Sequence, residues 1–193
     1  MEKNIQHAIE VLNHGGIVIF PTDTAFGIGC RIDREESIKR LFTLRNRPET
    51  KAVPVLVGSQ EMAKKYFRPI TSEIQKLMDA YWPGALTIVY FAQTDKIPDL
   101  VRGGGKTIGL RMPDHPDLLT IINAVGVPIL GPSANFAGDT TTFRMEDLDP
   151  ELVKRVDFVL TGVIKGNHQA STVIDCTKQP FRVLRQGGVV VNR

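Results

Sequence analysis

The sequence has few residues of the kinds that metal, redox and membrane proteins need. Its two cysteines, Cys30 and Cys176, are far apart and form no C-x-x-C pair, and its four histidines show no paired metal spacing. No apolar run approaches the roughly 20 residues that cross a bilayer, and the first residues lack the pattern of a secretory signal. We therefore expect a cytoplasmic protein that does not enter a membrane, with reduced and buried cysteines.

Two common nucleotide-binding motifs are also missing. The run Gly27-Ile28-Gly29 lacks the third glycine of a dinucleotide fingerprint, and no G-x-x-x-x-G-K-[ST] segment is present. A Rossmann cofactor site and a P-loop are therefore not supported, and neither is a mechanism built on histidine or zinc. The polar residues that are present are arginines and hydroxyls among glycines, which suit charge stabilisation more than proton transfer.

The chain has the length and composition of one globular domain. It has 193 residues, of which 42% are hydrophobic and 23% charged, and no linker divides it, so we expect a single domain over 1–193. The net charge of +3 is too small to indicate a dedicated nucleic-acid binder. Between positions 37 and 51, however, the only acid is Glu49, whereas the basic residues are Lys39, Arg40, Arg45, Arg47 and Lys51.

Hydrophobic periodicity predicts helices interleaved with strands early in the chain and strands clustered late. Helices are expected over 2–13, after a capping pair formed by Asp33 and Glu36, over 60–66, 72–81 and 118–125, and from about residue 150. Strands are expected over 17–20, 52–57, 85–91, 107–112, 127–130, 157–160, 172–175, 181–184 and 189–191. This order predicts an α/β fold whose sheet is mixed rather than purely parallel.

The stretch 15–30, GGIVIFPTDTAFGIGC, combines a strand, a hydroxyl-rich turn and a glycine exit. Open α/β sheets bind ligands at such strand ends, where Thr22, Asp23 and Thr24 would lie. Gly27 and Gly29 would allow positive φ or let a ligand approach the backbone closely. The alternative is an ordinary turn in which these polar side chains only satisfy the backbone.

Arginines provide the next signal. Arg45 continues the inward face of the helix that follows Asp33, so a permanent cation would lie at the edge of the core and would need an anionic partner. Either it pairs with an acid such as Asp23 or extends to water, or it forms a phosphate clamp with Arg47 and Lys51.

Further polar groups occur on later strands. Thr107, Gly109 and Arg111 share one face of an alternating strand, where Arg111 would either meet a ligand or lie on a solvated face. The segment 131–135, GPSAN, places hydroxyl and amide groups at another strand end, and Ser171 and Arg185 repeat this pattern near the C-terminus.

Five ordered motifs resemble one family over nearly the whole chain: GGIVIFPTDTAFGIG, RNRP, WPGALT, TIGLRMP and GPSAN. The chain is similar to the YrdC family of threonylcarbamoyl-AMP synthases, which act in making the t6A base of tRNA. The resemblance implies a twisted open α/β domain with a mixed sheet, flanking helices and a basic concave cleft. It also implies formation of threonylcarbamoyl-AMP and pyrophosphate from L-threonine, bicarbonate and ATP, with Mg²⁺ on the ATP phosphates and no metal held by the protein.

The resemblance also implies roles for individual residues. Arg45 and Arg47 would be catalytic and bind the ATP phosphates, whereas Thr22, Arg111 and Ser171 would bind threonine. The remaining expected ATP contacts are Lys51, Thr107, Ser133, Asn135, Thr141 and Arg185. Partner proteins of tRNA modification are implied as well.

Some features depart from the family pattern. Arg45 stands where a lysine is usual, Thr140-Thr141-Thr142 replaces a serine-proline pattern, and Gln186 replaces a common proline. We expect no counterpart of the additional C-terminal domain of the longer members. Two alternatives stay open: a module that binds double-stranded RNA or tRNA through the basic run 39–51, and a paralogue with altered activity.

Overall fold

The structure is a computed structural model that describes residues 2–164, 166 and 168–191. Its helices are α1 (Glu2–Asn13), α2 (Glu35–Leu44), α3 (Gln60–Tyr66), α4 (Ser72–Tyr81), α5 (Asp99–Arg102), α6 (Pro116–Val125) and α7 (Pro150–Val153), with a 3-10 turn η1 (Met145–Asp147). The strands are β1 (Val18–Pro21), β2 (Phe26–Gly29), β3 (Val55–Leu56), β4 (Leu86–Phe91), β5 (Thr107–Arg111), β6 (Ile129–Leu130), β7 (Phe158–Val159), β8 (Thr172–Asp175) and β9 (Arg182–Arg185).

The strands form two mixed sheets. The smaller has the order β2-β1-β7, in which β1 runs antiparallel to β2 and parallel to β7. The larger has the order β6-β3-β5-β4-β8-β9 and alternates antiparallel with parallel neighbours. Isolated bridges between Gly27 and Ser133 and between Arg31 and Ile129 join β2 and its exit to the β6 region. The predicted mixed α/β class is confirmed, although the strands divide into two sheets.

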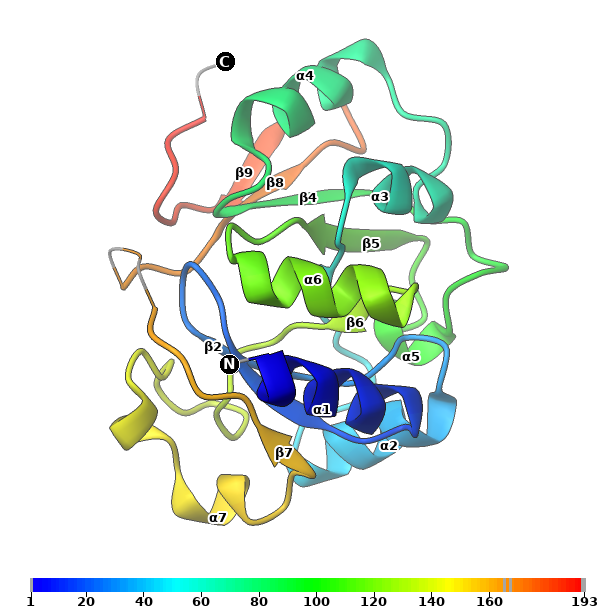
Figure 1. Ribbon diagram of the computed structural model, residues 1–193. Coiled ribbons are helices and arrows are strands. Elements are labelled where there is room, and N and C mark those ends of the chain that lie inside the picture. Colours follow the sequence, from blue (N-terminus) through cyan, green and yellow to red (C-terminus); the bar gives the residue numbers. More distant parts are fainter. Residues whose placement is uncertain (1, 165, 167, 192–193) are drawn as a thin grey trace.

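Helices cover the sheets on the side seen in Figure 1, where α6 lies in front of the larger sheet and α1 in front of the smaller one. The buried faces of α1 and α6 carry aliphatic residues such as Leu12 and Ile122, and both sheets share one hydrophobic cluster. None of the helices in the described part of the chain is both long and apolar enough to span a bilayer. The opposite face of the larger sheet remains available for a pocket.

Several helix boundaries follow from local capping. Ser59 and Thr71 accept hydrogen bonds from backbone N–H groups at the starts of α3 and α4, and α6 ends at Gly126 in the left-handed conformation. The predicted capping pair at α2 is wrong. Arg34 is the N-cap, without a side-chain cap, because Asp33 is held by the Arg31 guanidinium at 2.8 Å.

Strand β2 was not predicted, because a four-residue segment with two glycines carries no strand pattern. The structure explains the glycine at position 29 without a ligand, because a Cβ there would lie 1.8 Å from the Leu130 carbonyl oxygen of the neighbouring β6. Neither Gly27 nor Gly29 has a positive φ. Gly29 therefore serves close packing of backbone against backbone.

Other segments also differ from the predictions. The expected strand 52–57 is reduced to β3, and α5 forms in a segment expected to be a loop. Residues 189–191 form no strand, because the Thr172 hydroxyl donates to the Val189 carbonyl at 2.6 Å and accepts from the Val189 N–H at 3.2 Å. A side chain thereby replaces the backbone partner of a neighbouring strand.

Candidate functional site

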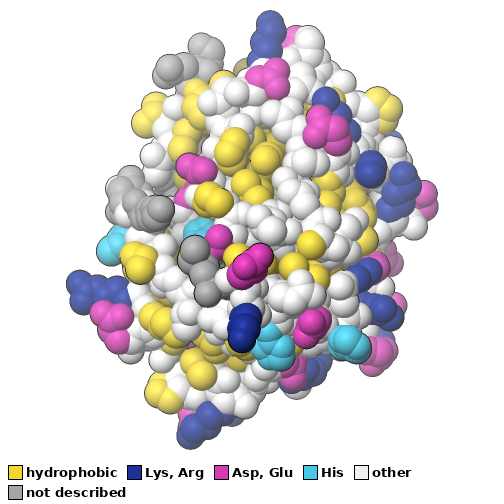
Figure 2. Space-filling model, viewed as in Figure 1, with side chains coloured by type: hydrophobic (Ala, Val, Ile, Leu, Met, Phe, Trp, Pro, Cys, Tyr) yellow, Lys and Arg dark blue, Asp and Glu magenta, His cyan; other side chains and the backbone are white. Residues whose placement is uncertain are grey.

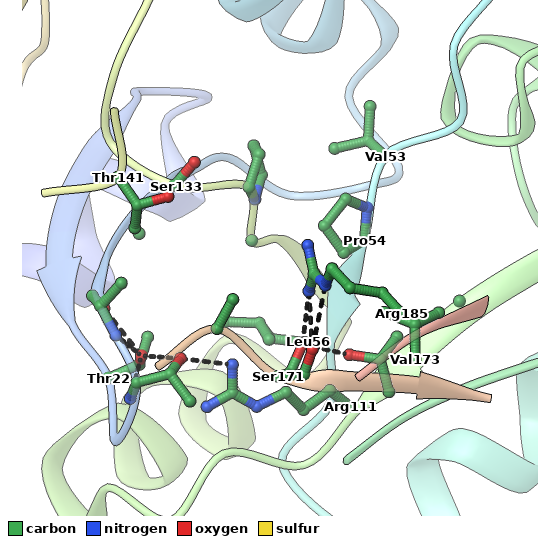
Figure 3. A pocket seen from close by; sticks show the side chains of 18 of the residues that line it. Thr22, Val53, Pro54, Leu56, Arg111, Ser133, Thr141, Ser171, Val173 and Arg185 are labelled. Atoms are coloured by element: carbon green, nitrogen blue, oxygen red, sulfur yellow. Dashed lines mark hydrogen bonds between the residues drawn. The ribbon is translucent and has the colours of Figure 1, made fainter. Parts of the chain in front are cut away.

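A pocket of about 380 Å³ lies between the two sheets and collects most of the predicted site residues (Figure 3). Its floor includes one face of the larger sheet, and its walls come from the β1–β2 turn, the end of α2 with the chain that follows it, and the segment after β6. The predicted residues that line it are Thr22, Arg45, Arg47, Thr107, Arg111, Ser133, Thr141, Ser171 and Arg185. Lys51 and Asn135 do not line it.

Strand alternation explains the floor. Thr107, Gly109 and Arg111 of β5 line the pocket, whereas Ile108 and Leu110 are buried in the core. This division is the one that a period of two residues predicts. In Figure 3, Arg111, Ser171 and Arg185 lie on one side of the pocket, opposite Ser133 and Thr141.

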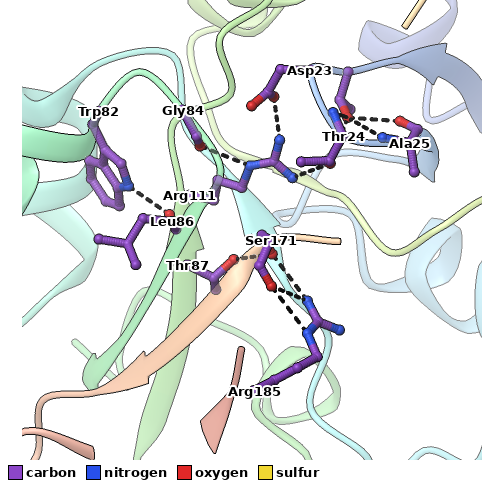
Figure 4. A network of polar contacts seen from close by, with 11 residues as sticks. Asp23, Thr24, Ala25, Trp82, Gly84, Leu86, Thr87, Arg111, Ser171 and Arg185 are labelled. Atoms are coloured by element: carbon purple, nitrogen blue, oxygen red, sulfur yellow. Dashed lines mark hydrogen bonds and ion pairs between the residues drawn. The ribbon is translucent and has the colours of Figure 1, made fainter. Parts of the chain in front are cut away.

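The Arg111 side chain is buried and held on several sides (Figure 4). Its Nε donates to the Gly84 carbonyl at 3.1 Å, its Nη1 donates to the Thr24 hydroxyl at 2.8 Å, and its Nη2 is ion-paired with Asp23. Burial lowers the pKa of Arg111, and the Asp23 charge opposes that shift. The guanidinium is thus held in place by the protein itself, and the described residues leave part of its donor capacity unused.

Thr22 both satisfies the backbone of its turn and lines the pocket, as the two interpretations of the sequence predicted separately. Its hydroxyl donates to the Ala25 carbonyl at 2.7 Å and accepts from the N–H groups of Thr24 and Ala25, as in an ordinary turn. The same residue lines the pocket beside Arg111. The turn therefore satisfies its own backbone while it presents threonine side chains to the pocket.

Arg45 lies at the C-cap of α2 and is only 3% exposed. Its Nε donates to the Asn135 carbonyl at 2.9 Å, whereas its Nη1 is buried without a hydrogen-bond partner among the described residues. Burial, and to a smaller extent the Arg47 charge, lowers the pKa of Arg45 to about 10. The expected alternative, a salt bridge to Asp23, does not form, because Asp23 pairs with Arg111.

Two neighbouring groups also lack partners. Arg47 donates from Nη2 to the Ala52 carbonyl at 2.7 Å, but its Nε has no partner within the part of the chain described, and burial lowers its pKa. The Asn135 side-chain oxygen is likewise unpartnered in that part of the chain, although its Nδ2 donates to two carbonyls. Buried donors are costly when unsatisfied, so the unpartnered N–H groups of Arg45 and Arg47 suit an anionic ligand, whereas the Asn135 oxygen is an acceptor outside the pocket lining and adds nothing to this preference.

A second polar network lies on β4, β8 and β9. Arg185 donates from Nε and Nη2 to the Ser171 carbonyl at 3.1 and 2.8 Å, and from Nη2 to the Ser171 hydroxyl at 3.1 Å. The hydroxyls of Ser171 and Thr87 are 2.9 Å apart. Burial lowers the pKa of Arg185. The position of the Ser171 hydroxyl is therefore set by both Arg185 and Thr87.

Sequence reasoning assigned no role to Thr87 and named Thr24 only as one polar residue of the turn, and the structure places both in these networks. Both lie within motifs that were recognised, and Thr87 is the polar residue on an otherwise apolar strand, so its face could have been deduced from alternation. The ion pair of Asp23 with Arg111 joins residues 88 positions apart, and nothing in the sequence predicted that pairing.

The basic run 39–51 does not form one surface. Lys39 is paired with Glu35 at 3.1 Å, Arg40 is paired with Asp157 at 2.6 Å, and Arg45 is buried. Lys51 is exposed. On the face shown in Figure 2, Lys and Arg side chains lie interspersed with Asp and Glu.

The fold and the pocket define a class of protein: a mixed α/β protein with four arginines and several hydroxyls around one ligand pocket. Among the described residues, no group of three His, Cys, Asp or Glu side chains is placed to hold a metal ion. The model of the Sua5/YciO/YrdC family, described as "Telomere recombination", matches residues 10–187. The chain belongs to this family.

Curated relatives and solved structures agree with this assignment. The threonylcarbamoyl-AMP synthase of Vibrio campbellii is 31% identical, with 96% of this chain and 100% of the relative covered. The enzyme of the same name from Bacillus subtilis is 30% identical, with 97% and 54% covered. A crystal structure of Pyrococcus abyssi Sua5 complexed with L-threonine has a TM-score of 0.93 at 30% identity, with 97% and 55% covered. The chain thus spans about half the length of the last two proteins.

Proposed function

We propose that this chain is an L-threonylcarbamoyladenylate synthase, which uses L-threonine, bicarbonate and ATP and releases pyrophosphate. The observation that carries the proposal is that one pocket contains arginines in two different surroundings. Arg111 lies among hydroxyls, as a carboxylate site requires, and Arg45 and Arg47 each carry a buried donor without a partner in the described chain. The names of the relatives and the threonine complex of Pyrococcus abyssi Sua5 support the same activity.

The pocket suggests how the reaction would proceed. The threonine carboxylate would bind Arg111, near Thr22 and Ser171, and the ATP phosphates would bind Arg45 and Arg47. Ser133, Thr141, Thr107 and Arg185 line the rest of the pocket and would contact the nucleotide. The threonine amine would first condense with bicarbonate, with release of water, to give N-carboxythreonine. An oxygen of its new carbamate group, not of the α-carboxylate on Arg111, would attack the α-phosphorus, and the bond from that phosphorus to the bridging oxygen of pyrophosphate would break. The cations would offset the charge that builds on the phosphates, and fixed positions would reduce the entropic cost.

Mg²⁺ would enter as part of the substrate MgATP. The described residues lining the pocket include no carboxylate, so the ATP phosphates and water would supply its ligands. We place the reaction in the cytoplasm, where partner proteins would transfer the product to tRNA to form t6A. Lys51 and Asn135 would act from outside the pocket lining, Asn135 through its contact with Arg45.

The test is pyrophosphate release that depends on ATP, bicarbonate and an amino acid. We expect release with L-threonine and much less with L-valine, which has a similar shape but lacks the hydroxyl. Release that is equal for all amino acids, or independent of threonine, would contradict the proposal. Arg111→Gln should raise the KM for threonine at least tenfold and change the affinity for ATP far less.

Binding of double-stranded RNA has less support, because two cations of the basic run are paired with acids and a third is buried. Arg47→Ala distinguishes the two functions. The synthase proposal expects weaker ATP binding, whereas an RNA module would lose affinity for RNA and show a steep dependence on salt.

A further inference from the structure

The arginines of the pocket differ in how their charge is balanced. Arg111 is ion-paired with Asp23, and both side chains are largely buried, with 8% and 14% of their surface exposed. Within the described part of the chain, Arg45, Arg47 and Arg185 form no ion pair, and their guanidinium hydrogen bonds go to carbonyls and a hydroxyl. Arg111 is therefore the arginine of the pocket whose charge is compensated within the described chain, although the unpaired Arg185 lies on the same side, and the charges of Arg45 and Arg47 are uncompensated.

Asp23 reaches Arg111 from outside the pocket. It is absent from the residues that line the cavity, whereas its neighbours Thr22 and Thr24 are among them. Figure 4 shows Asp23 and Thr24 approaching different nitrogens of the Arg111 guanidinium. Asp23 would thus affect a ligand only through Arg111, which itself lines the cavity.

This arrangement has a consequence for the choice of anion. A guanidinium and the buried carboxylate paired with it carry little net charge together. The guanidinium still donates directed hydrogen bonds, but the pair attracts a multiply charged anion only weakly. The affinity of a singly charged carboxylate falls little when the charge of the arginine is compensated, because its recognition depends mainly on the geometry of two hydrogen bonds. A phosphate chain gains more from the uncompensated arginines.

We propose that Asp23 is a specificity-determining positioning residue, whose carboxylate reserves Arg111 for a monoanionic carboxylate and directs phosphate groups to Arg45 and Arg47. Asp23 thereby prevents the nucleotide from binding across the amino-acid end of the pocket. The identity of the carboxylate as threonine rests on the proposed function, whereas the exclusion of phosphate does not.

The experiment measures pyrophosphate binding by calorimetry, with and without L-threonine. For Asp23→Asn we expect about tenfold tighter pyrophosphate binding and a new competition between pyrophosphate and threonine. Asp23→Glu, which keeps the charge, should restore the wild-type preference. Asp33→Asn is the matched control, because Asp33 also pairs with an arginine, Arg31, but neither residue lines this pocket. It should leave pyrophosphate binding unchanged.

A charge-neutral double variant, Asp23→Asn with Arg111→Gln, keeps the proposal testable if Asp23→Asn alone fails to fold. We expect it to bind pyrophosphate within about twofold of the wild type, because the intact pair adds no net attraction. A loss of tenfold or more would show that phosphate already binds Arg111 and would overturn the proposal. So would unchanged pyrophosphate affinity in folded Asp23→Asn. If the wild type does not bind threonine, the proposed function fails, and the pyrophosphate measurements still decide the role of Asp23.

Discussion

At the scale of single residues, Arg45 shows what an arginine can do that a lysine cannot. Its Nε donates to the Asn135 carbonyl, while Nη1 is buried without a hydrogen-bond partner in the described chain and, in the proposed function, would donate to the ATP phosphates. A lysine has one ammonium group for both tasks. The Arg45 side chain therefore joins the end of α2 to the segment after β6 and keeps a positive charge there, in addition to the backbone hydrogen bond from the Ala137 N–H to the Arg45 carbonyl.

We expect Arg45→Lys to weaken ATP binding about fivefold, because one hydrogen bond worth about 1 kcal/mol is lost while the charge is kept. Threonine affinity should change less than twofold. Calorimetric titration with each ligand measures both effects, and Arg40→Lys, on the exposed surface of the same helix, is the control. Unchanged ATP affinity in Arg45→Lys would mean that the hydrogen bond from Nε is dispensable. If the wild type has only a low synthase activity and Arg45→Lys does not change it, the result would favour a paralogue with altered activity.

At the scale of secondary-structure elements, two glycines on strands near the pocket have different structural roles. Gly29 of β2 allows the Leu130 backbone to approach, whereas Gly109 of β5 leaves space in the pocket, where a Cβ would be 3.3 Å from the Thr87 Cγ2. One glycine therefore maintains the junction of the sheets, and the other maintains the volume open to a ligand.

We expect Gly29→Ala to lower the free energy of unfolding by about 3 kcal/mol, because its methyl group would overlap backbone that has no room to move. Gly109→Ala should cost less than about 1 kcal/mol, because its Cβ would meet only the side-chain methyl groups of Thr87 and Val89, and it should instead weaken ligand binding. Denaturant unfolding and calorimetry of both variants measure these effects. Equal losses of stability would contradict this separation of roles.

The elements also show what the sequence can predict. Alternation in β5 was enough to place Thr107 and Arg111 on one face and Ile108 on the other, because that pattern is local. The partner of Asp23 and the neighbour of Gly29 could not be predicted, because each depends on chain packed from a distant part of the sequence. The capping prediction at Asp33 failed because Arg31, only two residues away, takes up its carboxylate.

At the scale of the whole molecule, the hydrophobic cluster encloses both cysteines. Cys30 is fully buried and Cys176 is 4% exposed, and both are free thiols. Burial raises the pKa of each thiol to about 12. The folded protein therefore keeps both thiols protonated at pH values where the unfolded chain loses those protons.

We expect the free energy of unfolding to fall as the pH rises from about 9 towards 12, since there the unfolded state binds fewer protons than the folded state. Each thiol adds at most about 1.4 kcal/mol per pH unit to this slope. Denaturant unfolding at several pH values measures it. The variant Cys30→Ala with Cys176→Ala should show a shallower slope, and an identical slope would contradict the assignment to these thiols.

The pocket draws its walls from both sheets, and the contacts of Arg111 with Asp23 and Thr24 join the β1–β2 turn to β5 across the gap. A substrate that contacts both the β1–β2 turn and β5 would add a second link between the two sheets at the same place. In the proposed reaction, a substrate bound in this way would restrain motion of one sheet against the other. Release of the products would restore that motion, so the sheets would be held together during each turnover and be free to move again after it.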